Sequence, residues 1–154
     1  MRDFCDADRK KKSGRITLPE NPSNLSEEVL VQLENAVKAA VKDGYVSCPA
    51  GWKVAGNVGV SRLDVGAMID KLSIRVTDCQ LACFAVSKTS HLGSATEPVS
   101  EGVASRVEAL EEKGELTCVN VFALASELNV KPMSVANAAN VKGYKIRQCQ
   151  LGCF

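Results

Sequence analysis

An internal repeat with a spacing of 70 residues constrains this chain more than any other feature of its sequence. At that offset, residues 33–84 align with residues 103–154 without a gap. Twelve of the 52 aligned positions are identical, and many of the others differ conservatively. Self-similarity at one fixed spacing is typical of a duplicated structural unit. The sequence therefore predicts two similar small domains.

The most similar part of the repeat is its last six residues. Residues 79–84 are CQLACF and residues 149–154 are CQLGCF, two segments that we call the first and second hexapeptides. Six of the seven cysteines follow the repeat, and they are Cys48, Cys79 and Cys83 in the first copy and Cys118, Cys149 and Cys153 in the second. Only Cys5 lies outside it.

Four segments follow from the repeat and from local composition. Residues 1–24 form a polar leader with a basic run at 9–12, which we interpret as a solvated tail or a weak phosphate-contacting arm. The repeats occupy residues 25–84 and 99–154. Residues 85–98 join them and are rich in Ser, Thr, Gly and Pro, as is typical of a linker.

Composition limits the partners and the cellular compartment. Hydrophobic residues make up 45% of the chain, enough for a core, and the formal net charge of +1 indicates no bulk attraction to nucleic acid or membrane. No apolar stretch of about 18 residues occurs, so we expect no membrane span. The charged N-terminus lacks the apolar segment of a secretory signal. We therefore expect a cytoplasmic protein, in which cysteines serve as ligands, redox groups or core residues more often than as permanent disulfides.

Hydrophobic periodicity predicts the same order of elements in each repeat: helix, short strand, helix, turn, helix, strand. In the first copy these elements are a helix after Ser26 that ends at Gly44, a strand at 45–48, helices at 50–58 and 62–71, and a strand at 73–78. The second copy has its strands at 115–118 and 144–147.

The central turn has a spacing that suits two crossing helices. Ala55 is small where the helices meet, and Gly59 suits a left-handed turn. The second copy has Ala125 and Asn129 at these positions, and Asn is the next-best residue for the left-handed conformation. Pro132 suits the first turn of the helix that follows.

These residues resemble a winged helix-turn-helix domain of the kind common in prokaryotic transcription regulators. The resemblance covers both repeats and implies a mainly α fold with small β elements (α+β), built as two tandem winged helix-turn-helix-like repeats. In that family the helix after the turn enters the major groove of DNA. The hexapeptides are not part of the general family pattern.

The resemblance implies DNA contacts from the outward positions of that helix, with Arg and Lys on phosphates and Asn on adenine. The candidate residues are Arg62 and Lys71 in the first copy and Lys131, Ser134, Asn137, Asn140 and Lys142 in the second. In the first copy, the negative charges of Asp64 and Asp70 on the same face offset the positive charges of Arg62 and Lys71. The alternative is that the helix-turn-helix is a scaffold whose small residues pack against the other repeat or a partner protein.

Three interpretations of the cysteines stay open. They fill core niches as small hydrophobic groups, they bind a zinc ion or an iron–sulfur cluster, or they form redox-active disulfides such as Cys48–Cys79 or Cys48–Cys83. Cys79 and Cys83 converge only if the residues between them turn, and Ala82 and Gly152 permit that bend. Zinc prefers four ligands, whereas each repeat supplies three thiols.

Catalytic sequence motifs are missing, so we do not expect an enzyme. The sequence favours a DNA-binding transcriptional regulator with cysteine-based redox or metal sensing. The alternative is a cysteine-ligated metal or iron–sulfur module that binds a protein partner within a larger enzyme system. The sequence does not indicate the oligomeric state.

Overall fold

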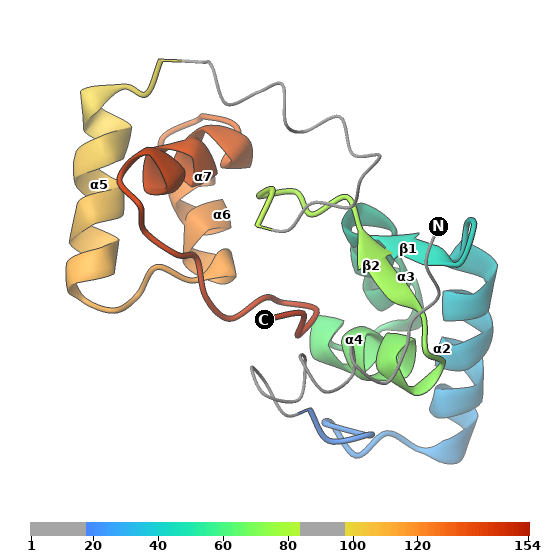
Figure 1. Ribbon diagram of the computed structural model, residues 1–154. Coiled ribbons are helices and arrows are strands. Elements are labelled where there is room, and N and C mark those ends of the chain that lie inside the picture. The colour runs from blue at the N-terminus through green and yellow to red at the C-terminus, as the bar shows by residue number, and fades with distance from the viewer. Residues whose placement is uncertain (1–17, 84–97) are drawn as a thin grey trace. The chain divides into compact units, whose positions relative to one another are not determined.

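The computed structural model describes residues 18–83 and 98–154, which are mainly helical with a small two-stranded parallel sheet (Figure 1). The chain divides into two compact units. Unit 1 comprises the chain up to Thr77 together with Gln150–Phe154, and unit 2 comprises Asp78–Cys149. This division differs from the predicted boundaries at residues 84 and 99. The basic run, Cys5 and most of the predicted linker lie outside the described residues.

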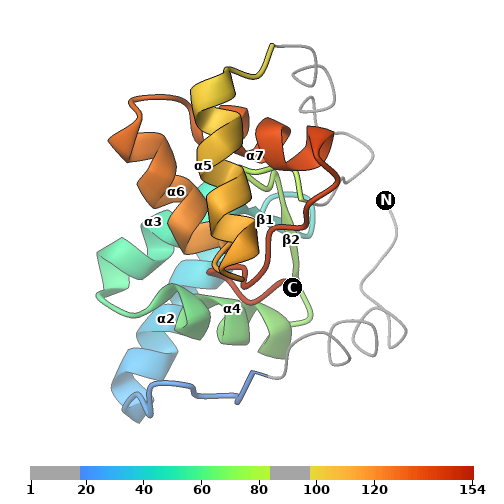
Figure 2. The same ribbon diagram turned by 90° about the vertical axis from the view of Figure 1, so that its left-hand side faces the viewer.

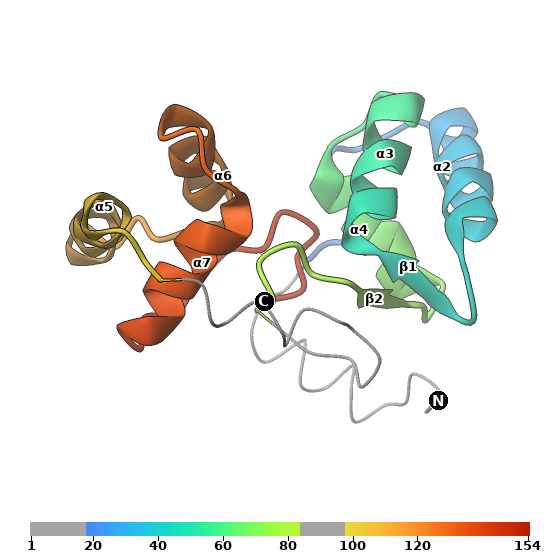
Figure 3. The ribbon, with the colours of Figure 1, turned by 90° about the horizontal axis from the view of Figure 1, so that it is seen from above.

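Unit 1 contains the elements in the predicted order. They are α2 (Glu27–Ala40), β1 (Tyr45–Ser47), α3 (Cys48–Val58), α4 (Arg62–Lys71) and β2 (Arg75–Thr77). Helix α2 packs against α3 and α4, and Figure 3 shows α2 beside α3. Leu33 and Val37 on α2 are fully buried in this core.

The helix ends in unit 1 follow from short polar side chains and glycine. Helix α3 begins at Cys48, two residues before the predicted start, because the Ser47 side chain accepts a hydrogen bond from the Ala50 amide at 3.3 Å. Gly59 ends α3 in the left-handed conformation at φ 76°, as predicted. Helix α4 has the predicted bounds, and Ser61 and Asp64 form a capping box at its start.

The two predicted strands of the first repeat pair with each other. Strand β1 runs parallel to β2, and Ser47 lies opposite Thr77. A parallel pair needs a long crossover connection, and here α3 and α4 supply it. The pairing places the start of α3 and the chain that leaves β2 at the same edge of the sheet.

Unit 2 contains α5 (Glu101–Glu112), α6 (Cys118–Glu127) and α7 (Pro132–Val141). Helix α7 packs against both α5 and α6 (Figure 2). Asn129 is left-handed at φ 52°, and Pro132 is the first residue of α7, both as predicted.

The two strands predicted for the second repeat do not form, and a single parallel bridge between Thr117 and Arg147 replaces them. The Arg147 amide donates to the Leu116 carbonyl at 3.0 Å, and the Cys118 amide donates to the Arg147 carbonyl at 2.9 Å. The closure of the preceding helix does not explain this difference, since the bond from the Tyr144 amide to the Ala139 carbonyl has a counterpart from Ile74 to Ile69 in unit 1, where β2 forms.

Backbone turns recur at the 70-residue spacing. Five pairs of positions have a positive φ at that offset: Gly44 and Gly114, Gly59 and Asn129, Ser73 and Gly143, Asp78 and Gln148, and Ala82 and Gly152. A positive φ is uncommon for residues other than glycine. The agreement therefore indicates that the backbone follows the same local path in both copies.

Candidate functional site

Each hexapeptide contains a tight bend, and the bend of the first hexapeptide brings Cys79 and Cys83 together. In the first hexapeptide the Ala82 amide donates to the Cys79 carbonyl at 3.0 Å, and Ala82 is left-handed at φ 51°. Gly152 is left-handed at φ 68° in the second. The predicted bend is therefore confirmed, although alanine accepts this conformation less readily than glycine does.

Four thiols gather in unit 2. Cys79, Cys118 and Cys149 are buried, and Cys83 is exposed. A hydrogen bond with the Cys79 thiol, partial burial, and the nearby thiols of Cys79, Cys118 and Cys149 together raise the pKa of Cys83. The Cys83 thiol also donates to the Leu81 carbonyl at 3.8 Å. Cys83 is thus protonated at neutral pH and lies in direct contact with a second thiol.

This grouping differs from the three thiols per repeat that the sequence indicates. Unit 2 takes two cysteines from each repeat, whereas Cys48 and Cys153 belong to unit 1. All six cysteines are thiols and not disulfides in the described part of the chain. Across residues 18–83 and 98–154, no three Cys, His, Asp or Glu side chains are arranged to hold a metal ion.

Residues 150–154 of the second hexapeptide pack in unit 1, where they cover part of α4 (Figure 1). Leu151 is fully buried. A methyl group on Gly66 would lie 2.8 Å from the Leu151 carbonyl carbon, and one on Gly51 would lie 3.2 Å from Leu151 Cδ1. The Arg62 guanidinium donates to Gln150 Oε1. Glycines on α3 and α4 therefore form a seat for Leu151.

The first hexapeptide packs in unit 2 in the corresponding way. Leu81 is 1% exposed and belongs to the same hydrophobic cluster as Val121 and Ala136. These two residues stand 70 positions after Gly51 and Gly66. The sequence pattern alone did not predict this exchange of hexapeptides between units. The pair of glycines at 51 and 66, where the other copy has larger residues, was the available signal.

The predicted DNA-contact face of α4 is largely covered. Arg62 is half-buried, and its guanidinium lies 3.5 Å from the centre of the Trp52 ring. Lys71 is exposed at the end of the helix. Asp64, Gly66 and Ala67 are buried, so the expectation that Asp64 points outward was wrong. Their small or hydrogen-bonded side chains suit close packing rather than base contacts.

Asp64 is buried because five hydrogen bonds satisfy its carboxylate and its amide. Its carboxylate accepts from the Ser61 hydroxyl at 2.6 Å and amide at 3.0 Å, and from the Ser23 hydroxyl at 2.8 Å and amide at 3.1 Å. Its own amide donates to the Ser61 hydroxyl oxygen at 3.1 Å. Burial acts to raise the pKa of Asp64, but the bonds from Ser61 and Ser23 outweigh burial and lower it. Asp64 thus joins the start of α4 to the segment before α2.

The predicted contact residues of α7 fall into two groups. Lys131, Asn140 and Lys142 are exposed, whereas Ser134 is half-buried and Asn137 is only 8% exposed. The expected outward position of Asn137 was therefore wrong. Lys142 bonds to Glu108 on α5 at 2.7 Å, and this contact with a carboxylate raises the pKa of Lys142.

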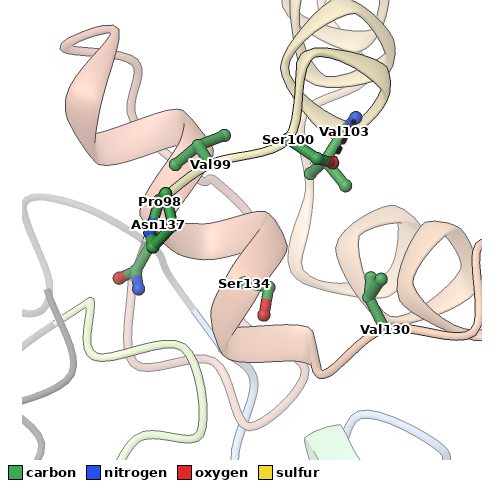
Figure 4. A pocket seen from close by; sticks show the side chains of 7 residues that line it. All are labelled: Pro98, Val99, Ser100, Val103, Val130, Ser134 and Asn137. Carbon is green, nitrogen blue, oxygen red and sulfur yellow. Dashed lines mark hydrogen bonds between the residues drawn. The ribbon is translucent and has the colours of Figure 1, made fainter. Parts of the chain in front are cut away.

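Ser134 and Asn137 line a small pocket in unit 2, of about 160 Å³ (Figure 4). The other lining residues are Pro98, Val99, Ser100, Val103 and Val130. Ser100 also caps α5, since its side chain accepts from the Val103 amide at 3.4 Å. Two of the predicted DNA-contact residues thus face a cavity between helices of one unit.

Acidic partners neutralise several exposed cations. Arg106 pairs with Glu127 at 2.8 Å, Arg147 pairs with Glu111 at 3.2 Å, and Lys38 pairs with Glu34 at 2.6 Å. Such surface pairs contribute little to stability, but they reduce the positive potential available to phosphates. These pairs therefore reduce the number of described cations that are available for counterion release.

Comparison with known proteins gives no relative for this chain, since no family model, curated protein or solved structure matches it significantly. Within the described residues, no helix combines the length and the apolar character needed to cross a bilayer.

Proposed function

We propose that this chain is a thiol-responsive regulator built from two tandem winged helix-turn-helix-like repeats. The observation that carries the proposal is the gathering of Cys79, Cys83, Cys118 and Cys149 in unit 2. The first hexapeptide supplies two of these thiols and also inserts Leu81 into the core. A chemical change at the thiols thus acts directly on the packing of unit 2.

Oxidation is the chemistry that the geometry favours. The thiols of Cys79 and Cys83 are hydrogen-bonded, and the bend between them holds both on one turn. Each thiol loses its S–H hydrogen as the S–S bond forms, and a hydrogen peroxide molecule accepts two electrons and two protons to become two waters. A thiophilic metal such as zinc is the second candidate, because unit 2 contains four thiols, but binding would require them to rearrange, since no three such side chains in the described residues are arranged to hold a metal ion.

Cysteine-resolved mass spectrometry of the full chain, under graded peroxide and then thiol reductant, tests the thiol proposal. We expect Cys79 and Cys83 to be oxidised together and reversibly. Cys83→Ser should abolish this pair, whereas Cys48→Ser, a change in unit 1, should leave it intact. Equal oxidation of all cysteines, or none, would contradict the redox proposal. Metal analysis of anaerobically purified protein tests the zinc alternative.

DNA binding is the proposed output, and the exposed Lys131, Asn140 and Lys71 support it. Fluorescence anisotropy with mixed genomic fragments at low salt is the direct measurement. We expect weak, salt-sensitive binding that changes on oxidation, and Lys131→Ala should weaken it across all sequences. The absence of salt-sensitive binding at micromolar protein would contradict the DNA proposal. A protein partner would then be the better candidate.

A further inference from the structure

The two hexapeptides are exchanged between the units. The first hexapeptide follows β2 of unit 1, yet its Leu81 completes the core of unit 2. Residues 150–154 follow the helices of unit 2, yet Leu151 completes unit 1. Neither unit is therefore filled by the hexapeptide of its own repeat.

The seats and the segments that fill them are alike. Five of the six hexapeptide residues are identical. Leu151 contacts Gly51 and Gly66, and Leu81 is buried in the hydrophobic cluster that contains Val121 and Ala136, the equivalent positions of the other copy. The seat in unit 1 thus holds a bent segment through Leu151 on Gly51 and Gly66 and through Gln150 on Arg62. A second molecule of the chain presents an identical segment.

A hinge precedes the second hexapeptide. Arg147 is held by two backbone hydrogen bonds, to Leu116 and Cys118. The next residue, Gln148, is exposed and left-handed at φ 54°. A residue with a Cβ is disfavoured in that conformation, and glutamine lacks the short polar side chain that lets Asn or Asp adopt it. Short strained hinges favour domain swapping.

We propose that this chain forms a dimer in which two molecules exchange residues 150–154. In the dimer, Gln148 takes an extended conformation, and the second hexapeptide of each molecule occupies the seat on α3 and α4 of the other. The exchange remakes the contacts of Leu151 with Gly51 and Gly66 and that of Gln150 with Arg62. It needs no new apolar surface, and it produces the two-fold symmetry common among soluble dimers.

Native mass spectrometry of the full chain, with reductant present throughout, tests the proposal. Isotopically labelled and unlabelled chains are mixed, incubated warm, and measured from micromolar to millimolar concentration. We expect mixed dimers that form slowly, because the seated hexapeptide must leave before it is exchanged. Reductant excludes intermolecular disulfides as the cause.

Matched variants at Gln148 give the sharpest result. Proline cannot adopt a positive φ, so Gln148→Pro should tighten the dimer dissociation constant about tenfold. Glycine accepts the left-handed conformation, so Gln148→Gly should weaken the dimer by a similar factor. Because this side chain is exposed, neither change alters a packed core.

The seat itself supplies a second test. Gly66→Ala places a methyl group against the Leu151 backbone and should abolish the dimer, whereas Gly56→Ala, on α3 with no atom within 4 Å, should leave it unchanged. A strictly monomeric wild type, with no mixed dimer and no response to Gln148→Pro, would overturn the proposal. The Gln148 variants decide the question even if Gly66→Ala fails to fold.

Discussion

At the scale of single residues, buried polar groups in this chain are tied to local backbone structure. Asp64 is 2% exposed and accepts hydrogen bonds from Ser61 and Ser23, which keep its carboxylate ionised. Cys83 shows the opposite effect, because neighbouring thiols and partial burial keep it protonated. The protonation of Asp64 therefore makes the stability of unit 1 depend on pH, and the protonation of Cys83 makes the rate of thiol oxidation depend on pH.

Asp64→Asn should reduce the stability of unit 1 by about 1–3 kcal/mol at neutral pH, since the amide cannot accept all the bonds that the carboxylate accepts. The folded-state pKa of Asp64 is lowered, so its contribution is complete above the ordinary carboxyl pKa of about 4 and is lost as the pH falls through the folded value. Urea unfolding followed by Trp52 fluorescence measures this. The difference between wild type and variant should shrink on acidification, and a difference that is independent of pH would contradict the assignment.

Oxidation of the Cys79–Cys83 pair should accelerate with rising pH. The raised pKa of Cys83 keeps its thiolate fraction small at neutral pH, and that fraction grows about tenfold per pH unit below the pKa. Where attack by Cys83 limits the reaction, the rate of disulfide formation should follow this rise. Stopped-flow oxidation of the full chain, with Cys48→Ser as the matched control, measures the rate. A rate that levels off below neutral pH would show that Cys83 is not the attacking group.

At the scale of elements, the helix pair α3 and α4 and the helix pair α6 and α7 differ at the turn between the helices and at the start of the helix that follows. Gly59 and Asn129 occupy the same left-handed position, with φ of 76° and 52°. Capping groups also differ, since Ser61 and Asp64 cap α4 whereas Lys131 and Pro132 begin α7. The same left-handed turn is therefore stabilised by different residues in the two helix pairs.

Asn129→Gly and Gly59→Ala should change stability in opposite directions. Glycine at 129 removes the cost of a left-handed Asn and should stabilise unit 2 by a few tenths to about 1 kcal/mol, while alanine at 59 should destabilise unit 1 by about 1 kcal/mol. Thermal unfolding with hydrogen exchange resolved by unit measures both effects. If the two variants shifted stability in the same direction, the left-handed turn would not control these segments.

At the scale of the whole molecule, the exchanged hexapeptides make each unit depend on the other repeat. Leu151 is encoded after unit 2 and buried in unit 1, and Leu81 is encoded after unit 1 and buried in unit 2. A unit deprived of its leucine loses part of its core. A substitution in the hexapeptide of one repeat should therefore destabilise the unit that contains the helices of the other repeat.

Leu151→Ala should destabilise unit 1 by about 2–5 kcal/mol, and Leu81→Ala should destabilise unit 2 by a similar amount. Trp52, the single tryptophan, lies on α3 and reports unit 1, while amide exchange of α5, α6 and α7 reports unit 2. Leu151→Ala should shift the Trp52 transition more than Leu81→Ala does. The reverse order would mean that each hexapeptide packs in its own repeat.

The amino-acid sequence by itself determined the local structure of this protein. Helical periodicity set α4 at its observed bounds, Gly59 and Asn129 set the turns, and Ala82 and Gly152 permitted the bends of the hexapeptides. These features depend on the φ and ψ preferences of a few adjacent residues. The short strands of the second repeat were predicted wrongly, since a single bridge between Thr117 and Arg147 forms in their place.

Only the tertiary structure decided which unit each hexapeptide enters, and hence which thiols meet and which helix positions are buried. The two hexapeptides are nearly identical and their seats are similar, so the sequence allows each hexapeptide to occupy either seat. The φ and ψ preferences of the residues are the same in either arrangement. The choice depends on packing between residues far apart in the chain, such as Leu151 against Gly66. That packing also buried Asp64 and Asn137, whose positions the helical pattern alone placed on the outer face.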